Sequence, residues 1–304
     1  MSITVNSARG QTRRRVALRS RLHMSPIAVA AAVLLGLFVL AAAVGPFLTA
    51  SPNAQSLAES YVHPFGWSGG TSHHLLGTDQ LGRDILARAV NALRISFFTA
   101  GLAIVIGAVV GTTLGMLAGY VGGILDDIVM RCVDVQLAIP GIILVLMLVA
   151  ALRPSFWSVV GVLALVAWVL YARVARAQVL ALREDDMIVA VRSLGASKFR
   201  TIFRHLLPNI MGPLLVVTTL EIASLIIAEA ALGYLGLGVP PPTATLGRMI
   251  ADGQSGETAG IWWPVVVPGL FIVGMIVSIN ILGEWLRDWL DPKGNQLAVK
   301  GEVR

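Results

Sequence analysis

Six apolar blocks occupy most of this sequence, and they are sized like helices that cross a lipid bilayer. They cover residues 26–48, 95–121, 133–152, 156–171, 210–236 and 261–282. A spanning helix needs about 20 apolar residues, and only helices or closed barrels satisfy their backbone polar groups inside hydrocarbon. The fourth block is short but continues into a helical pattern, and none alternates as barrel strands do. We therefore predict an all-α integral membrane bundle with six transmembrane helices.

The composition excludes a soluble globular protein, and the length of the first block excludes a cleaved export signal. Apolar residues make up 56% of the chain and charged residues 13%. Signal peptides carry roughly 7 to 15 apolar residues, whereas block 26–48 is longer and precedes five more blocks. We predict an uncleaved transmembrane helix at 26–48, after a basic tail at 1–25.

The distribution of positive charge predicts the orientation in the membrane. With six spans, one side of the membrane holds 18 of the 23 Lys and Arg residues and the other side holds 5. Cytoplasmic loops are enriched in these residues, so both termini are expected in the cytoplasm, including the tails 1–25 and 291–304. The net charge of +6 reflects this topology and predicts no nucleic-acid partner.

One basic, polar segment, residues 183–208, interrupts the apolar blocks on the cytoplasmic side. It is typical of two short helices separated at Gly195, where a left-handed residue is wanted. Asp185 or Asp186 can cap the first helix, Ser197 can cap the second, and Pro208 is expected to end it. Helices this short are marginal alone in water, so the segment predicts a protein partner.

Two loops of substance lie on the outer side. In the loop 49–94, the sequence turns helical after Thr78 or Asp79 and has one apolar face, which predicts a helix lying along the membrane surface before the second span. The loop 237–260 carries three consecutive prolines and is expected to be irregular and stiff.

Carboxylates within the spans are costly and therefore face a partner or a water-filled path. Glu221 and Glu229 lie eight residues apart on roughly one face of the fifth span. Two alternatives stay open: they bond across helices, or their face lines a translocation path. In the second span, Gly101, Gly107, Gly111 and Gly115 favour close helix packing.

Candidate chemical sites are few. His73 and His74 are neighbours without a set of further metal ligands, and Asp79 and Asp84 are better explained as caps or ion-pair partners. The lone Cys132 allows no internal disulfide. No phosphate-binding GxxxxGK[ST] loop, GxSxG or HExxH motif is present, so we expect no enzyme, no metal and no cofactor, and any ATP energy must enter from another subunit.

The polar segment resembles the EAA loop of ABC importer permeases. Val189, Ala190 and Val191 stand at the Glu-Ala-Ala triplet, Gly195 is the glycine, and Leu207 with Pro208 closes the pattern. Stretches at 74–84, 119–140, 192–197, 203–209 and 227–247 are similar to the dipeptide, oligopeptide and nickel branch, and to its C-type subunit in particular. Two positions depart from that pattern: Val189 replaces a glutamate, and Leu246 replaces a common tryptophan.

The resemblance implies a type I importer permease of the bacterial plasma (inner) membrane, with a core at 95–290. It also implies a second permease subunit in a heterodimer, two ATP-binding subunits, an external solute-binding protein and surrounding membrane lipid. Its ATPase-coupling residues would be Met187, Ala190, Arg192, Leu194, Gly195, Ala196, Ser197, Arg200, Arg204, His205 and Pro208.

Two alternatives to this function stay open. An ATP-independent secondary transporter would show inverted repeats and broken central helices, and we find no repeat. An intramembrane enzyme would show paired catalytic groups, which the adjacent Asp126 and Asp127 do not form. The cargo stays open too, because nothing in the spans separates dipeptides from longer peptides, nickel chelates or glutathione.

Overall fold

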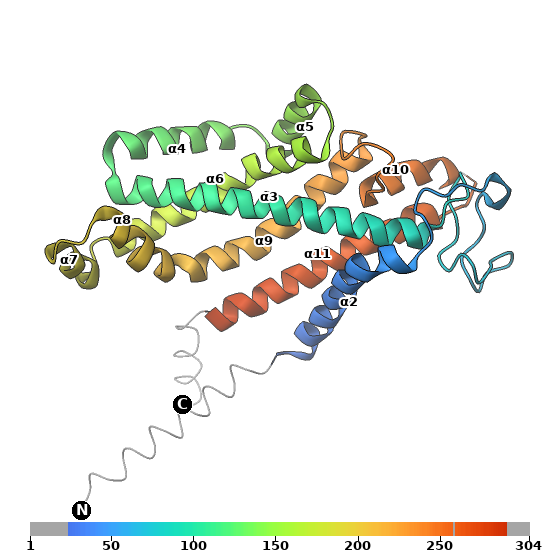
Figure 1. The fold of residues 1–304 in the computed structure, drawn as a ribbon, viewed down its shortest axis with the longest axis horizontal. Helices are drawn as coiled ribbons and strands as arrows, with labels where there is room; N and C mark the ends of the chain where they lie inside the picture. The colour runs from blue at the N-terminus through green and yellow to red at the C-terminus, as the bar shows by residue number, and fades with distance from the viewer. Residues whose placement is uncertain (1–23, 258, 291–304) are drawn as a thin grey trace, which may run out of the picture.

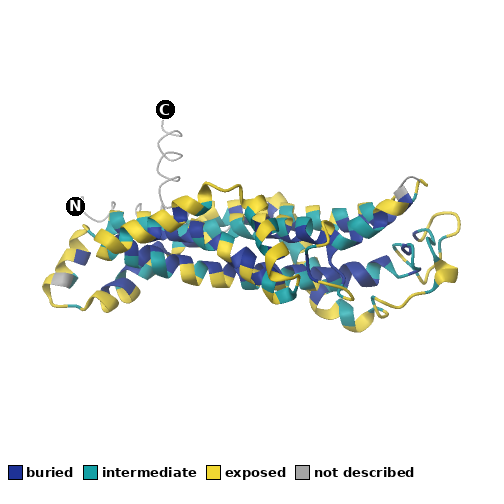
Figure 2. Ribbon diagram, turned by 90° about the horizontal axis from the view of Figure 1, so that it is seen from above, coloured by how far each residue is buried: buried dark blue, intermediate teal, exposed yellow. Residues whose placement is uncertain are grey.

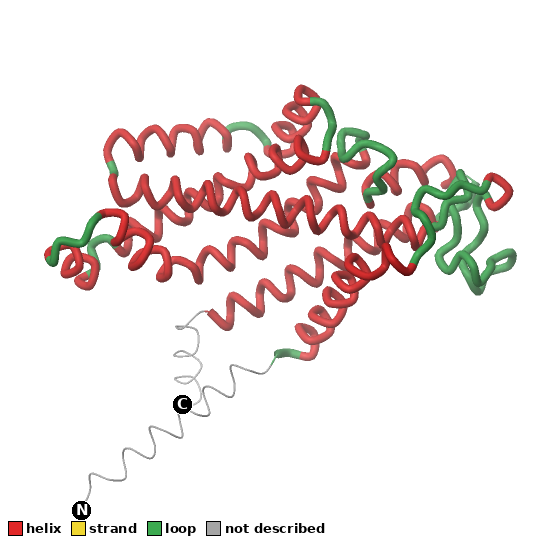
Figure 3. The backbone as a smooth tube through the Cα atoms, viewed as in Figure 1, coloured by secondary structure: helices red, strands yellow, loops and turns green. Residues whose placement is uncertain are grey.

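The computed structural model describes residues 24–257 and 259–290, and every regular element in them is helical (Figures 1 and 3). The predicted cytoplasmic tails therefore lie almost entirely outside the described residues. The elements are α2 (Pro26–Leu48), η1 (Leu57–Glu59), α3 (Ile85–Val121), α4 (Gly123–Leu137), α5 (Gly141–Leu152), α6 (Phe156–Leu182), α7 (Asp186–Ser193), α8 (Lys198–Arg200), the π-helical η2 (Thr201–Leu206), α9 (Leu207–Tyr234), α10 (Leu246–Glu257) and α11 (Trp263–Leu290).

The all-α prediction is confirmed for this part of the chain. Five helices are long and apolar enough to span a membrane, and the bent pair α4 and α5 makes a sixth span if it counts as one. Figure 1 shows the long helices running side by side, with α7 and α8 at one end of the bundle and the loop between α2 and α3 at the other. We call these the coupling end and the outer end.

The seam between α3 and α6 forms the centre of the bundle. A Cβ added at Gly111 would meet the backbone of Trp168, one added at Gly115 would meet the backbone of Ala172, and one added at Gly107 would lie 2.8 Å from the Cβ of Ala167. The predicted close packing is therefore confirmed for these three glycines, since small residues let helix backbones approach. It is wrong for Gly101, around which an added Cβ would meet nothing within 4 Å.

Large apolar residues on the outward faces of the long helices are exposed within the described part of the chain (Figure 2). On α2, for example, Leu37 is 57% exposed and Phe47 is 79% exposed. In a bilayer, lipid tails cover such faces as well as protein does. This exposure fits the membrane assignment.

The third span, predicted as one apolar block at 133–152, is not a single helix. The chain instead forms α4 and α5, which meet at an angle of 93°. Pro140 occupies the N-cap of α5 and makes Ile139 unfavourable for a continuing helix. The break therefore has a local cause.

Two predictions for the outer loops are wrong. The loop 237–260 is not irregular throughout, because α10 occupies residues 246–257. The loop 49–94 does not form a separate surface helix. Asp84 caps a helix that runs without interruption from Ile85 to Val121, and its Oδ1 accepts from the Ala87 backbone N–H at 2.8 Å. No glycine or proline separates the amphipathic turns from the apolar span. Those first turns are also buried, because the outer loop and α10 cover them, so they are part of the core.

Candidate coupling site

The polar segment between α6 and α9 is built by local capping. The Asp185 side chain accepts from the Met187 backbone N–H at 2.9 Å, at the start of α7. Gly195 follows α7 with φ of +81°, and Ser197 accepts from the Arg200 N–H at 3.3 Å. The predicted left-handed glycine and the predicted serine cap are both confirmed.

The end expected at Pro208 is wrong. Pro208 is the second residue of α9 and directly follows the π-helical turn η2, so a local change of helix type, and not an end of the helix, accommodates this residue without a backbone N–H. α8, η2 and α9 form one continuous helix of 37 residues, Lys198–Tyr234. The second half of the polar segment is therefore the first part of the fifth span, and a displacement of this segment moves α9 directly.

Three buried side chains anchor the segment to the bundle. Ile188, Ile202 and Leu206 are each at most 2% exposed, and all belong to the main hydrophobic core. The opposite surface is open and includes large apolar side chains: Leu194 is 88% exposed and Phe199 is 72% exposed. Exposed apolar patches of this kind mark protein-interaction sites. We call Met187, Leu194, Phe199 and Phe203 the tip patch.

Most predicted coupling residues lie on this open surface. Phe199 and Phe203, whose ring centroids lie 4.5 Å apart, were missed, although two aromatic residues four apart in a polar segment were a usable signal. His205 and Ala196 are half-buried, and the Arg192 side chain lies outside the described part of the chain. The exposed members are Met187, Ala190, Leu194, Gly195, Ser197, Arg200, Arg204 and Pro208.

An ion pair ties α4 to α6 toward the same end of the bundle. Arg176 donates from Nε and Nη2 to the two carboxylate oxygens of Asp126, at 2.5 and 2.6 Å. Two parallel bonds from a guanidinium to a carboxylate fix orientation as well as distance. The pairing joins residues 50 apart in sequence, so spacing alone could not predict it.

The two span carboxylates lie in different surroundings. Glu229 is 1% exposed, and its Oε2 accepts from Ser96 of α3 at 2.8 Å. The sequence left two alternatives for this carboxylate, a bond to another helix or a position on the translocation path, and this contact matches the first. Glu221 is half-buried and makes no such bond to a described residue. A role in the path stays a prediction for both.

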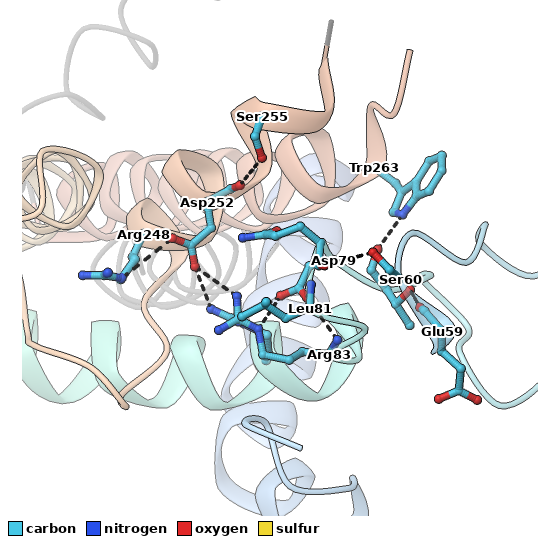
Figure 4. A network of polar contacts seen from close by, with 12 residues as sticks. Glu59, Ser60, Asp79, Leu81, Arg83, Arg248, Asp252, Ser255 and Trp263 are labelled. Carbon is cyan, nitrogen blue, oxygen red and sulfur yellow. Dashed lines mark hydrogen bonds and ion pairs between the residues drawn. The ribbon is translucent and has the colours of Figure 1, made fainter. Parts of the chain in front are cut away.

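The outer end holds a buried charge network (Figure 4). Asp79 accepts from Arg83 Nε at 2.7 Å and from Arg88 Nη1 at 2.9 Å. Asp252 of α10 accepts from the same two arginines at 3.2 and 3.3 Å, and lies 3.8 Å from Arg248. The network therefore fastens the outer loop and α3 to α10. Burial raises the pKa of the Asp252 carboxyl, which the positive charges of Arg83 and Arg248 oppose.

The predicted roles of the acidic residues in the outer loop are confirmed. Asp84 caps α3 and also contacts His74 Nδ1 at 2.8 Å, and Asp79 is an ion-pair partner. Among the described residues, no group of three or more His, Cys, Asp or Glu side chains could hold a metal ion.

A further hydrogen bond joins the outer loop to α11. Thr78, next to Asp79, accepts at its backbone oxygen from the buried Trp263 indole at 3.0 Å.

A family model described as "Binding-protein-dependent transport system inner membrane component" matches residues 111–295. The chain belongs to this family. It is thus the permease component of an ABC importer and a multi-pass protein of the bacterial inner membrane, and ATP hydrolysis resides in partner subunits. The family assignment also implies a solute-binding protein among its partners.

Individual relatives agree with the family. The dipeptide transport system permease protein DppC of Haemophilus influenzae is 37% identical over 258 residues, 85% of this chain and 86% of that one. DppC of Bacillus subtilis is 38% identical over 277 residues, 90% of this chain and 84% of that one. A chain from inward-facing structures of the MetNI methionine ABC transporter shares the fold, with a TM-score of 0.51, 20% identity, and coverage of 68% of this chain and 96% of that chain.

Proposed function

We propose that the chain is one of two permease subunits in an importer of di- or oligopeptides, and that residues 183–208 receive an ATPase subunit. Support for the cargo comes from the names of the relatives, which are dipeptide and peptide transport permeases. The second permease subunit completes the translocation path. The charge distribution supports an orientation with both termini and the segment 183–208 in the cytoplasm.

The observation that carries the coupling role is the pairing of an open apolar tip patch with an unbroken helix. An ATPase surface that covers Leu194 and Phe199 removes apolar area from water, which stabilises the contact. The same contact moves the start of the 37-residue helix, so closure of the ATPases becomes a tilt of α9. Rocking of packed elements between two positions is the usual form of such a transition.

Copurification tests this role. The double variant Leu194→Ser/Phe199→Ser should lose the ATPase subunits when the tagged chain is extracted in mild detergent, because the tip patch is then polar. A matched control is Leu57→Ser/Leu75→Ser, which removes two exposed leucines at the outer end and should retain them. Equal recovery of the ATPases with both variants would contradict the coupling role.

Uptake tests the cargo separately. Cells that depend on this chain should accumulate a labelled dipeptide, and the accumulation should stop on ATP depletion while the proton gradient is held. Uptake of a nickel chelate or glutathione in place of peptides would contradict the proposed peptide cargo but not the proposed coupling role. Uptake that survives ATP depletion would favour a secondary transporter.

A further inference from the structure

Two cavities meet at one arginine near the outer end of the bundle. Both are lined by Arg94 and Phe98 of α3. The first has a volume of about 420 Å³ and lies between the start of the outer loop, α3, the start of α6 and the loop before α10. Its polar side chains are Asn53, Asn91 and Thr243. The second, of about 350 Å³, is an apolar groove between α2 and α3, lined also by Val39, Ala42, Ala43 and Phe97.

Arg94 has no carboxylate within 4.0 Å among residues 24–257 and 259–290, unlike the neighbouring Arg83 and Arg88. Its guanidinium lies 5.8 Å from the ring centre of Phe98, a cation–π contact that leaves the charge uncompensated. The side chain is exposed, so nothing within the described chain covers it.

The neighbouring helix α2 indicates that Arg94 lies near the outer edge of the membrane's hydrocarbon core. α2 has 23 residues without one charged side chain and is about 34 Å long, close to the thickness of a bilayer's hydrocarbon core. The groove residues Ala42 and Ala43 lie roughly 8 to 9 Å before its outer end. An arginine beside them lies just inside the outer boundary of the hydrocarbon, from which its long side chain can extend outward to a headgroup phosphate.

We propose that Arg94 and the α2–α3 groove form a binding site for one anionic phospholipid. The phosphate pairs with the Arg94 guanidinium, and Asn53 and Thr243 supply further polar groups from the first cavity. One acyl chain lies in the groove along Val39, Ala43 and Phe98. The bound lipid would join α2 to the loop before α10, which no described side-chain hydrogen bond does.

The pairing of the two cavities distinguishes this ligand from other anions. A free phosphate ion would use the polar cavity alone and would gain nothing from the groove. A neutral lipid would fill the groove and gain less at Arg94, because charge-assisted hydrogen bonds to phosphate are about twice as strong as neutral ones. Only a lipid with net negative charge uses both features fully.

Native mass spectrometry tests the proposal on the full-length chain with its copurifying subunits, titrated with palmitoyl-oleoyl phosphatidylglycerol or the matching phosphatidylcholine. Phosphatidylglycerol should bind Arg94→Gln about tenfold more weakly than wild type, as expected for losing one hydrogen-bonded charge. Arg153→Gln removes an exposed arginine near the same end of the bundle and should bind as wild type does. Ala43→Phe fills the groove, keeps the charge, and should also weaken binding.

Three results would overturn the proposal. Equal phosphatidylglycerol binding by wild type and Arg94→Gln would remove the role of the charge. Displacement by inorganic phosphate, with Ala43→Phe unaffected, would indicate a free-anion site. A photo-crosslinker at position 98 that captures a second permease chain in place of lipid would show that the groove is a protein interface. If Arg94→Gln fails to assemble, Ala43→Phe and the crosslinker still decide the outcome.

Discussion

The coupling end and the outer end of this permease contain similar residue types, but these are exposed at the coupling end and paired within the chain at the outer end. At the coupling end, Leu194 and Phe199 stand open and the arginines Arg200 and Arg204 are exposed. At the outer end, Arg88 is buried and Arg83 is half-buried, and their charges are met by carboxylates of the same chain. One end is left for a partner to complete, and the other is completed within the chain. The same side chain therefore indicates binding in one place and stability in the other.

The largest effect is expected from breaking the outer network at its most buried member. The Arg88 side chain is 4% exposed and contacts both Asp79 and Asp252. Arg88→Met leaves two carboxylates short of a partner, which costs about 3–5 kcal/mol of unfolding free energy. Denaturant unfolding in detergent measures this. Arg248→Met, whose pair is longer and more exposed, should cost at most about 1 kcal/mol; equal losses would show that the network is not the cause.

At the coupling end, a substitution should damage transport more than stability. Gly195→Val puts a β-branched residue at φ of +81°, which costs about 1–3 kcal/mol locally and turns α7 relative to α8. Peptide uptake should fall at least about tenfold, the change in rate that about 1.4 kcal/mol in the transport barrier produces, while the thermal midpoint of the detergent-solubilised complex changes little. Gly161→Val on the open face of α6, where an added Cβ meets nothing within 4 Å, is the matched control and should transport normally. Normal uptake by Gly195→Val would contradict the coupling role.

The smallest effect concerns pH at the outer end. Burial raises the folded-state pKa of Asp252 above 3.8, so the folded chain binds this proton more tightly than the unfolded chain does. Stability from this group is therefore greatest at low pH and is lost as pH rises through the folded pKa. The unfolding free energy of the wild type, relative to that of Asp252→Asn, should therefore fall as pH rises above 3.8. If the difference in unfolding free energy between the two proteins does not change with pH, the arginines offset the effect of burial on the pKa of Asp252.

Local sequence signals predicted the parts of the coupling site that depend on single residues. Gly195 was identifiable because few residues other than glycine adopt a left-handed turn, and Ser197 because its hydroxyl caps the next turn. Pro208 misled the prediction because proline inside a helix usually ends or kinks it, whereas here the π-helical η2 directly before it lets the helix continue. Whether the helix continues past Pro208 depends on the joining of η2 to α9, and the packing of Ile202 and Leu206 against the core holds η2 in place.

The sequence by itself determined that this chain crosses the membrane as helices, that a capped polar segment lies between the fourth and fifth spans, and to which family it belongs. These properties follow from the length of apolar blocks and from contacts between near neighbours in sequence. Only the tertiary structure decided which charges are buried and which are open. Arg88 and Asp252 lie 164 residues apart, and their pairing exists because α3 and α10 pack together. Burial is a property of the whole fold, so no local pattern reports it.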